Sequence, residues 1–192
     1  MIRDGTGKGY LVQVTSTNRL AVEAISKSLQ HEISENKGQA YQVIGMATLA
    51  SGTVISLHIL NTSSTRNLVV TYIRHQIIDE SGGTALPNAS NYFRIAFNRT
   101  FSSGGSTVTP VNLNQGSGNE AEVTAYDTNP TLAGTAKEID RWYTKAEADM
   151  NTFNKEGSIV IQPNHTMELA YIGDQTSGTL YTRLSFLMEV PD

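Results

Sequence analysis

The stretch from Thr53 to Val190 most constrains what this chain of 192 residues can fold into. Short runs of β-branched and aromatic residues alternate there with turns rich in Gly, Ser, Thr and Asn. Strands favour the first kind of residue and turns favour the second, so the pattern predicts about eight to ten strands in an all-β domain. We expect a jelly roll or β-sandwich rather than a small barrel.

The apolar residues in these runs mostly recur at every second position, which is the period of a strand. Ile55, Leu57 and Ile59 are expected on one face of their strand, and Phe93, Ile95, Phe97 and Arg99 on one face of another, with Arg94 and Asn98 on the opposite, solvated face. The run 67–78 is long enough to bend from one sheet to another. The predicted strands are 53–60, 67–78, 91–101, 107–114, 138–144, 157–162, 167–173 and 180–190.

The segments between these runs read as loops. The clusters 81–84 and 102–107 are Gly-rich loop tips, and Pro110 places its strand at an edge or a bulge. A long polar excursion covers residues 115–137. Loops of that length are usually functional or held by a partner.

Residues 1–40 differ from the rest and are interpreted as an extended N-terminal arm, followed by a sandwich domain over 41–192. Gly9 to Val14 alternates as a short strand, and a second apolar stretch follows over 19–25. Leu29 and Ile33 lie four residues apart, a spacing that permits one or two helical turns within 26–37.

Bulk composition excludes several functions. The net charge is −4 and charges of one sign are not grouped, so we expect no binding to nucleic acid or to anionic lipid. The chain has no cysteine, which excludes disulfides and thiolate chemistry. No apolar run approaches the roughly 20 residues of a membrane span. A soluble protein made in a cytoplasm is expected.

No motif predicts catalysis or a cofactor. Gly5 to Gly9 resembles a phosphate loop, but Lys8 is followed by Gly9 where the nucleotide-binding motif requires Ser or Thr. His58 and His75 lie in predicted strands that can be neighbours, yet two histidines make an incomplete metal site. The carboxylates Glu120, Glu122, Asp127, Glu138 and Asp140 can pair across a groove as in glycosidases, although loop solvation explains them better. We expect no metal, no cofactor and no enzymatic activity.

Three arginines and one tryptophan are candidates for contact with a partner. Arg94, Arg99 and Arg183 lie in or beside apolar strands, where a guanidinium can pair with a carboxylate across a subunit contact or occupy the polar face of a sheet. Trp142 and Tyr143, with Tyr41, can form a platform for carbohydrate, but a role as a core or interface anchor is favoured.

Several segments resemble virion structural proteins of tailed bacteriophages. They are the opening Asp4–Tyr10 with Val14, Arg19 and Leu20, the middle stretch 110–119, and the ending 159–190. The resemblance covers most of the chain and includes no catalytic motif. It implies a jelly roll that assembles as a homotrimer and an N-terminal segment that attaches to the virion.

The resemblance therefore predicts a capsid decoration (cement) protein on the capsid surface. Its partners would be the major capsid protein and copies of itself. The alternative is a tail fibre, a spike or another module that binds a glycan on the host surface through loops near Ser103 and Gly116. The residues expected to contact partners are Gly5, Gly7, Tyr10, Leu11, Arg19, Arg94, Arg183 and Trp142.

Overall fold

The computed structural model describes residues 29–78, 90–143 and 151–191. A short helix, α1 (Leu29–Glu32), continues as a π-helical turn, η1 (Ile33–Lys37). The strands that follow are β1 (Ala40–Thr48), β2 (Gly52–Asn61), β3 (Asn67–Ile78), β4 (Tyr92–Phe97), β5 (Thr100–Ser103), β6 (Ser106–Val108), β7 (Val111–Asn112), β8 (Val123–Asp127), β9 (Thr131–Ala133), β10 (Lys137–Tyr143), β11 (Asn151–Ile161), β12 (Thr166–Gly173) and β13 (Thr179–Glu189).

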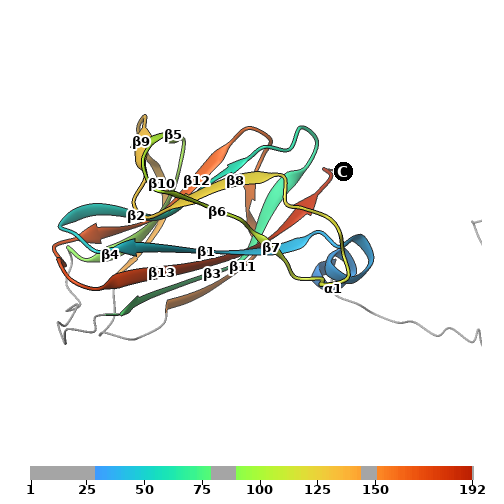
Figure 1. Ribbon diagram of the computed structural model, residues 1–192, viewed down its shortest axis with the longest axis horizontal. Helices are drawn as coiled ribbons and strands as arrows, with labels where there is room; N and C mark the ends of the chain where they lie inside the picture. The colour runs from blue at the N-terminus through green and yellow to red at the C-terminus, as the bar shows by residue number, and fades with distance from the viewer. Residues whose placement is uncertain (1–28, 79–89, 144–150, 192) are drawn as a thin grey trace, which may run out of the picture.

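Eleven of these strands form two packed antiparallel sheets (Figure 1), and β5 and β9 form a separate two-stranded sheet. The five-stranded sheet has the order β11-β3-β13-β1-β7, and the six-stranded sheet has the order β10-β4-β12-β2-β8-β6. Without β6, β7 and β8, two four-stranded sheets remain, in which the last strand of the chain pairs between β1 and β3, and β12 pairs between β2 and β4. This is the strand order of a jelly roll, so the predicted fold class is confirmed.

The core lies between the two sheets and is built from the inward residues that the period-2 pattern marks. Tyr41 of β1 stacks on Phe186 of β13, with ring centroids 5.7 Å apart. Fully buried partners come from both sheets: Leu57, Ile59, Leu68, Ile73, Ile95, Met167, Leu169 and Leu184. Burial of this apolar surface supplies most of the free energy that stabilises the sandwich.

One chain of hydrogen bonds crosses this apolar core. Ser56 Oγ donates to the carbonyl oxygen of Leu169, and Thr182 Oγ1 donates to Ser56 Oγ at 2.6 Å. Because both hydroxyl protons are then committed, His75 must donate from Nδ1 to Thr182 Oγ1, at 2.8 Å. The chain joins β3 and β13 of one sheet to β2 and β12 of the other, and leaves His75 Nε2 buried with no hydrogen-bond partner.

Three strand expectations are corrected by the register. Ile55 does not share a face with Leu57 and Ile59, because a bulge in the pairing of β2 with β12 reverses the alternation between Ile55 and Leu57. The segment 67–78 is one strand of one sheet and does not bend into the other. The histidines His58 and His75 lie in different sheets, so their strands are not neighbours.

The predicted strand 91–101 is interrupted. Phe93, Ile95 and Phe97 face the core as expected. Asn98 then adopts a positive φ of 73°, which ends β4 and redirects the chain into β5. Arg99 therefore leaves the core face, and the face expected to be solvated carries the fully buried Ala96.

The chain between β4 and β10 is an insertion that contacts both sheets. Its turn at Gly104 and Gly105, both with positive φ, confirms the predicted loop tip. The predicted strand 107–114 is divided: β6 ends at Val108 at the edge of one sheet, β7 begins at Val111 at the edge of the other, and Pro110 lies in the link between them. The expected polar excursion over 115–137 is not wholly loop, because it contains β8 and β9.

The helical turns predicted within 26–37 are confirmed by α1 and η1. Ile33 is buried against Ala40 and Leu187, so the helix is attached to the five-stranded sheet. The strand expected over 9–14 and the apolar stretch 19–25 lie outside the described residues, as does the loop tip 81–84. No helix in the described part of the chain is long and apolar enough to cross a membrane.

Candidate functional site

The outer face of the five-stranded sheet carries several exposed large apolar side chains. On β1 and β13 the outward side chains of Ile44, Met46 and Tyr181 are exposed by 48%, 46% and 36%. The pairing places Ile44 beside Arg183 and Met46 beside Tyr181. Ile78, at the end of β3, is also exposed. We call these residues, with Arg183, the open face.

Arg183 lies in the middle of the open face, between Ile44 on one side and Arg74 on the other. It makes no ion pair with any residue that the structure describes. A guanidinium is more weakly hydrated than an ammonium group and pairs bidentately with planar carboxylates. The open face therefore has the composition of a contact surface, in which aromatic residues, Met and Arg are enriched.

The outer face of the six-stranded sheet is covered. Strands β5 and β9 pair as a two-stranded flap, which stands beside this sheet in Figure 1. Leu132 of the flap packs on Ile55 and Ala170 of the sheet. Phe101 of the flap stacks on Tyr126 of β8, with ring centroids 3.8 Å apart and an interplanar angle of 5°. The flap covers an apolar surface that would otherwise be exposed to solvent.

A buried ion cluster lies on the same covered face. Glu168 is only 1% exposed and forms ion pairs with Arg94 and with Arg99, the latter at 3.3 Å. Arg99 also donates from Nη2 to the carbonyl oxygen of Leu132, 2.9 Å away, which links the cluster to the flap. Arg94 is therefore part of an intramolecular ion pair, and its charge is compensated within the fold.

His58 completes the cluster. It lies opposite Glu168 in the pairing of β2 with β12, and its Nε2 donates to the carbonyl oxygen of Arg99 at 3.0 Å. Nδ1 is buried with no hydrogen-bond partner. Burial lowers the pKa of His58 below its usual value, so the neutral ring is favoured.

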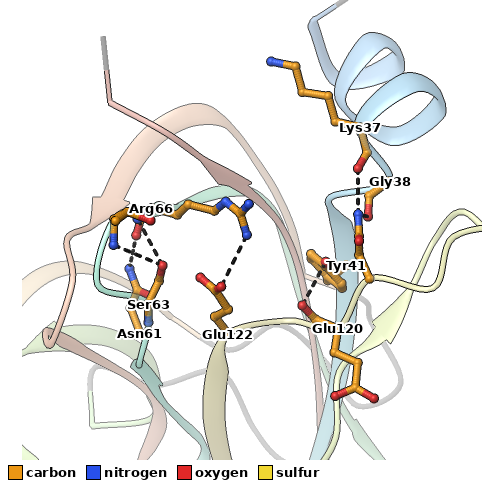
Figure 2. Close-up of polar contacts among 10 residues, drawn as sticks. Lys37, Gly38, Tyr41, Asn61, Ser63, Arg66, Glu120 and Glu122 are labelled. Carbon is orange, nitrogen blue, oxygen red and sulfur yellow. Dashed lines mark hydrogen bonds and ion pairs between the residues drawn. The ribbon is translucent and has the colours of Figure 1, made fainter.

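A groove of about 1310 Å³ lies on the five-stranded sheet beside the helix. Apolar side chains line it from the helix (Ile33), from β3 (Val69), from β11 (Val160) and from β13 (Leu187). Lys37 and Arg66 contribute the positive charges of the lining. Arg66 is paired with Glu122 at 3.4 Å (Figure 2).

The insertion holds the helix next to this groove. The last carbonyl groups of a helix have no partner within it, and here three asparagine amides supply one. Asn114 Nδ2 donates to the carbonyl oxygen of Ser34 at 2.9 Å, Asn112 Nδ2 to that of Gly38 at 2.8 Å and Asn119 Nδ2 to that of Lys37 at 2.9 Å. Nearby, the Tyr41 hydroxyl donates to the carbonyl oxygen of Glu120 (Figure 2). We call this set of bonds the asparagine clamp.

Gly38 makes the clamp possible. It ends the helix with φ of 58°, a left-handed conformation that glycine adopts without strain. A Cβ at this position would also collide with the Ser117 side chain. The start of the polar excursion 115–137 is thus held by the end of the chain's own helix, through Ser117 and Asn119.

The other residues predicted to contact partners are dispersed. Gly5, Gly7, Tyr10, Leu11 and Arg19 lie outside the described residues. Arg183 is on the open face. Trp142 packs on Phe93, Phe153 and His75, with the Phe153 ring centroid 4.0 Å away, so it is a core anchor rather than an exposed platform.

The carboxylates that sequence analysis considered for catalysis also separate. Glu138 pairs with Arg141, Asp140 with Lys155 and Glu122 with Arg66, while Asp127 accepts the backbone N–H of Met46. Arg141 donates to Glu138 through two N–H groups and holds the pKa of that carboxyl below its usual value. Across the described ranges, no three His, Asp or Glu residues are grouped as metal ligands would be.

Glu168 is the functional-looking residue that sequence analysis missed. The sequence does mark this residue, because Glu168 is the one charged residue within the apolar run of β12, and a charged residue in such a run is rarely buried without a partner. The sequence does not indicate that two arginines, one on β4 and one in the turn after β4, pair with this carboxylate.

No protein-family model and no curated protein matches this chain.

Proposed function

We propose that this chain is a non-enzymatic structural protein of a virion, and that it binds the outer surface of a capsid as a decoration protein. The observation that carries the proposal is the open face. Its large apolar side chains are exposed on a sheet whose backbone is already ordered. A partner that covers these side chains would therefore release water without any loss of backbone conformational entropy in the sheet.

The composition of the open face argues for a protein partner. Scattered exposed apolar residues are ordinary, but contiguous patches mark contact surfaces. Here Ile44, Met46 and Tyr181 occupy neighbouring register positions on two paired strands, with Arg183 among them. A carboxylate from the partner opposite Arg183 would gain a charge-assisted hydrogen bond with its guanidinium.

The amino-acid composition of the chain supports the same proposal. Charged residues make up 17% of the sequence, below the typical value of about 25%. Without cysteine, stability has to come from burial, from hydrogen bonding or from association with other subunits. The two surfaces assigned to assembly are the open face and the N-terminal residues 1–40.

The first experiment is a count of copies per particle. Quantitative mass spectrometry of purified virions would give the ratio of this chain to the major capsid protein. A ratio near one or a simple fraction supports capsid decoration. A handful of copies would move the protein to a tail or vertex, and absence from particles would overturn the proposal.

A second experiment tests the open face directly. Tyr181→Asp places a carboxylate in the open face, whereas Tyr143→Asp changes another exposed tyrosine, on β10 of the other sheet. We expect Tyr181→Asp to lose capsid binding in a co-sedimentation assay and Tyr143→Asp to keep it. Equal binding by both variants would remove the open face from the proposal.

A further inference from the structure

The groove beside the helix has a lining suited to an extended peptide. Ile33 and Leu187 are buried in its floor, Val69 packs against them, and Val160 is 43% exposed along one side. Polar and charged groups surround this apolar floor, among them Lys37 and Asn154. At about 1310 Å³ the groove exceeds the roughly 300–1,000 Å³ of small-molecule sites, so its size fits a length of chain.

The position of the groove indicates which segment of this chain could bind in it. Gln30, Ile33 and Lys37 line it from the helix, one turn or two after the first described residue. The asparagine clamp fixes this helix on the sheet. Residues 1–28 therefore join the described structure beside the groove.

Within residues 1–28, the stretch Gly9 to Val14 matches the groove in chemistry. Tyr10, Val12 and Val14 alternate with Leu11 and Gln13. In an extended conformation the first three side chains lie on one side, spread over about 13 Å. That side is wholly apolar apart from the tyrosine hydroxyl, as an apolar floor with a polar surround requires.

The connecting chain is long enough. The residues between Val14 and Leu29 can span up to about 45 Å when extended, so the stretch can reach the groove of its own molecule or of a neighbour. We propose that the groove binds residues Gly9 to Val14 of this chain, with Tyr10, Val12 and Val14 on its floor. The proposal does not rest on the assignment to a virion.

Site-specific photo-crosslinking in the full-length chain tests it. Benzoylphenylalanine in place of Tyr10 is irradiated, and the crosslinked peptides are mapped by mass spectrometry. We expect links to the groove lining, chiefly to Met188, Val160 and their neighbours. Links confined to other surfaces, or none, would overturn the proposal. A mixture of isotopically light and heavy protein distinguishes links within one molecule from links between two, and either kind supports the groove as the binding site.

Two matched pairs of variants sharpen the result. Val160→Asp should lower the crosslink yield about tenfold, since it removes the apolar contact that the Val160 side chain would make with the bound segment. Tyr181→Asp, on the same sheet outside the groove, should leave the yield unchanged. Val12→Asp should lower the yield similarly, while Leu11→Asp, on the opposite side of the extended stretch, should not.

A yield unchanged by Val160→Asp would contradict the proposal even if crosslinks form. Circular dichroism and thermal melting establish that each variant is folded. Val160 is exposed enough for substitution to spare the core. Hydrogen exchange gives an independent measurement: amides of residues 10–14 should be protected in the wild type and lose that protection in Val160→Asp.

Discussion

The outer face of the six-stranded sheet is covered by the chain's own flap, whereas the outer face of the five-stranded sheet is open along β1 and β13. Ala170 and Ile55 are buried under Leu132, while Ile44 and Met46 have no covering segment among the described residues. Both faces carry apolar side chains and arginines. The insertion between β4 and β10 thus covers part of the outer face of one sheet and leaves that of the other sheet exposed along β1 and β13.

Charge follows the same division. On the covered face Arg94 and Arg99 share ion pairs with the buried Glu168. On the open face Arg183 has no such carboxylate within the described structure. Substitutions on the covered face should therefore cost folding stability, and substitutions on the open face should cost association.

The largest expected effect is on the covered face. Glu168→Ala leaves two arginines without their shared carboxylate, and breaking a buried ion pair costs about 3–5 kcal/mol. Urea unfolding at pH 7 measures the loss. Glu122→Ala, which breaks the exposed pair with Arg66, is the control and should cost at most about 1 kcal/mol. Similar losses in the two variants would mean that the cluster does not stabilise the covered face.

Removing the flap contact should have the next largest effect. Leu132→Ala deletes the side chain that packs on Ile55 and Ala170, and large-to-small changes at buried sites cost about 2–5 kcal/mol. We expect the lower part of that range, because the flap can settle onto the sheet. Amide exchange should rise in β5 and β9 and stay unchanged in β1 and β13. A uniform rise would show that the flap unfolds only with the whole domain.

Acid should weaken the core between the two faces. Burial lowers the pKa of His75 to about 3. As the pH falls below about 6.5, the unfolded chain binds the proton first, so the free energy of unfolding should fall by up to about 1.4 kcal/mol per pH unit until the folded pKa is reached. Urea unfolding at pH 7, 6 and 5 measures the slope, and His75→Gln should flatten it. A slope unaffected by that variant would assign the acid sensitivity to other groups.

A smaller effect is expected at the asparagine clamp. Asn114→Ala removes the donor to Ser34 and to Glu35, and a single hydrogen bond of this kind contributes about 1 kcal/mol. Global stability should change little, while amide exchange in the helix should increase. Gln115→Ala, next in the sequence, provides the comparison. Unchanged exchange in Asn114→Ala would show that the burial of Ile33 alone holds the helix.

The smallest effect on folding is expected on the open face. Ile44→Ser and Met46→Gln change exposed side chains, so the free energy of unfolding should stay within about 0.5 kcal/mol of the wild type. Their self-association or capsid binding, measured by analytical ultracentrifugation and co-sedimentation, should fall. Loss of stability comparable to that of Leu132→Ala would show that the open face is part of the folded core.

Local patterns predicted much of this fold. The strands β3, β12 and β13 and the helical turns around Ile33 follow from alternation and spacing that a few adjacent residues carry. The bulge at Ser56 and the turn at Asn98 do not, because each depends on how a distant strand pairs. The covered face could not be predicted for the same reason, because nothing near Glu168 in the sequence specifies that Arg99 will form an ion pair with it.

The asparagine clamp has a mechanical consequence. A pull on the chain at residue 29 would load the helix first, and the amides of Asn112, Asn114 and Asn119 would share that tension with the pairing of β1. Bonds loaded in parallel resist force better than bonds broken one after another. The insertion would thus transmit force applied to the N-terminal segment to both sheets.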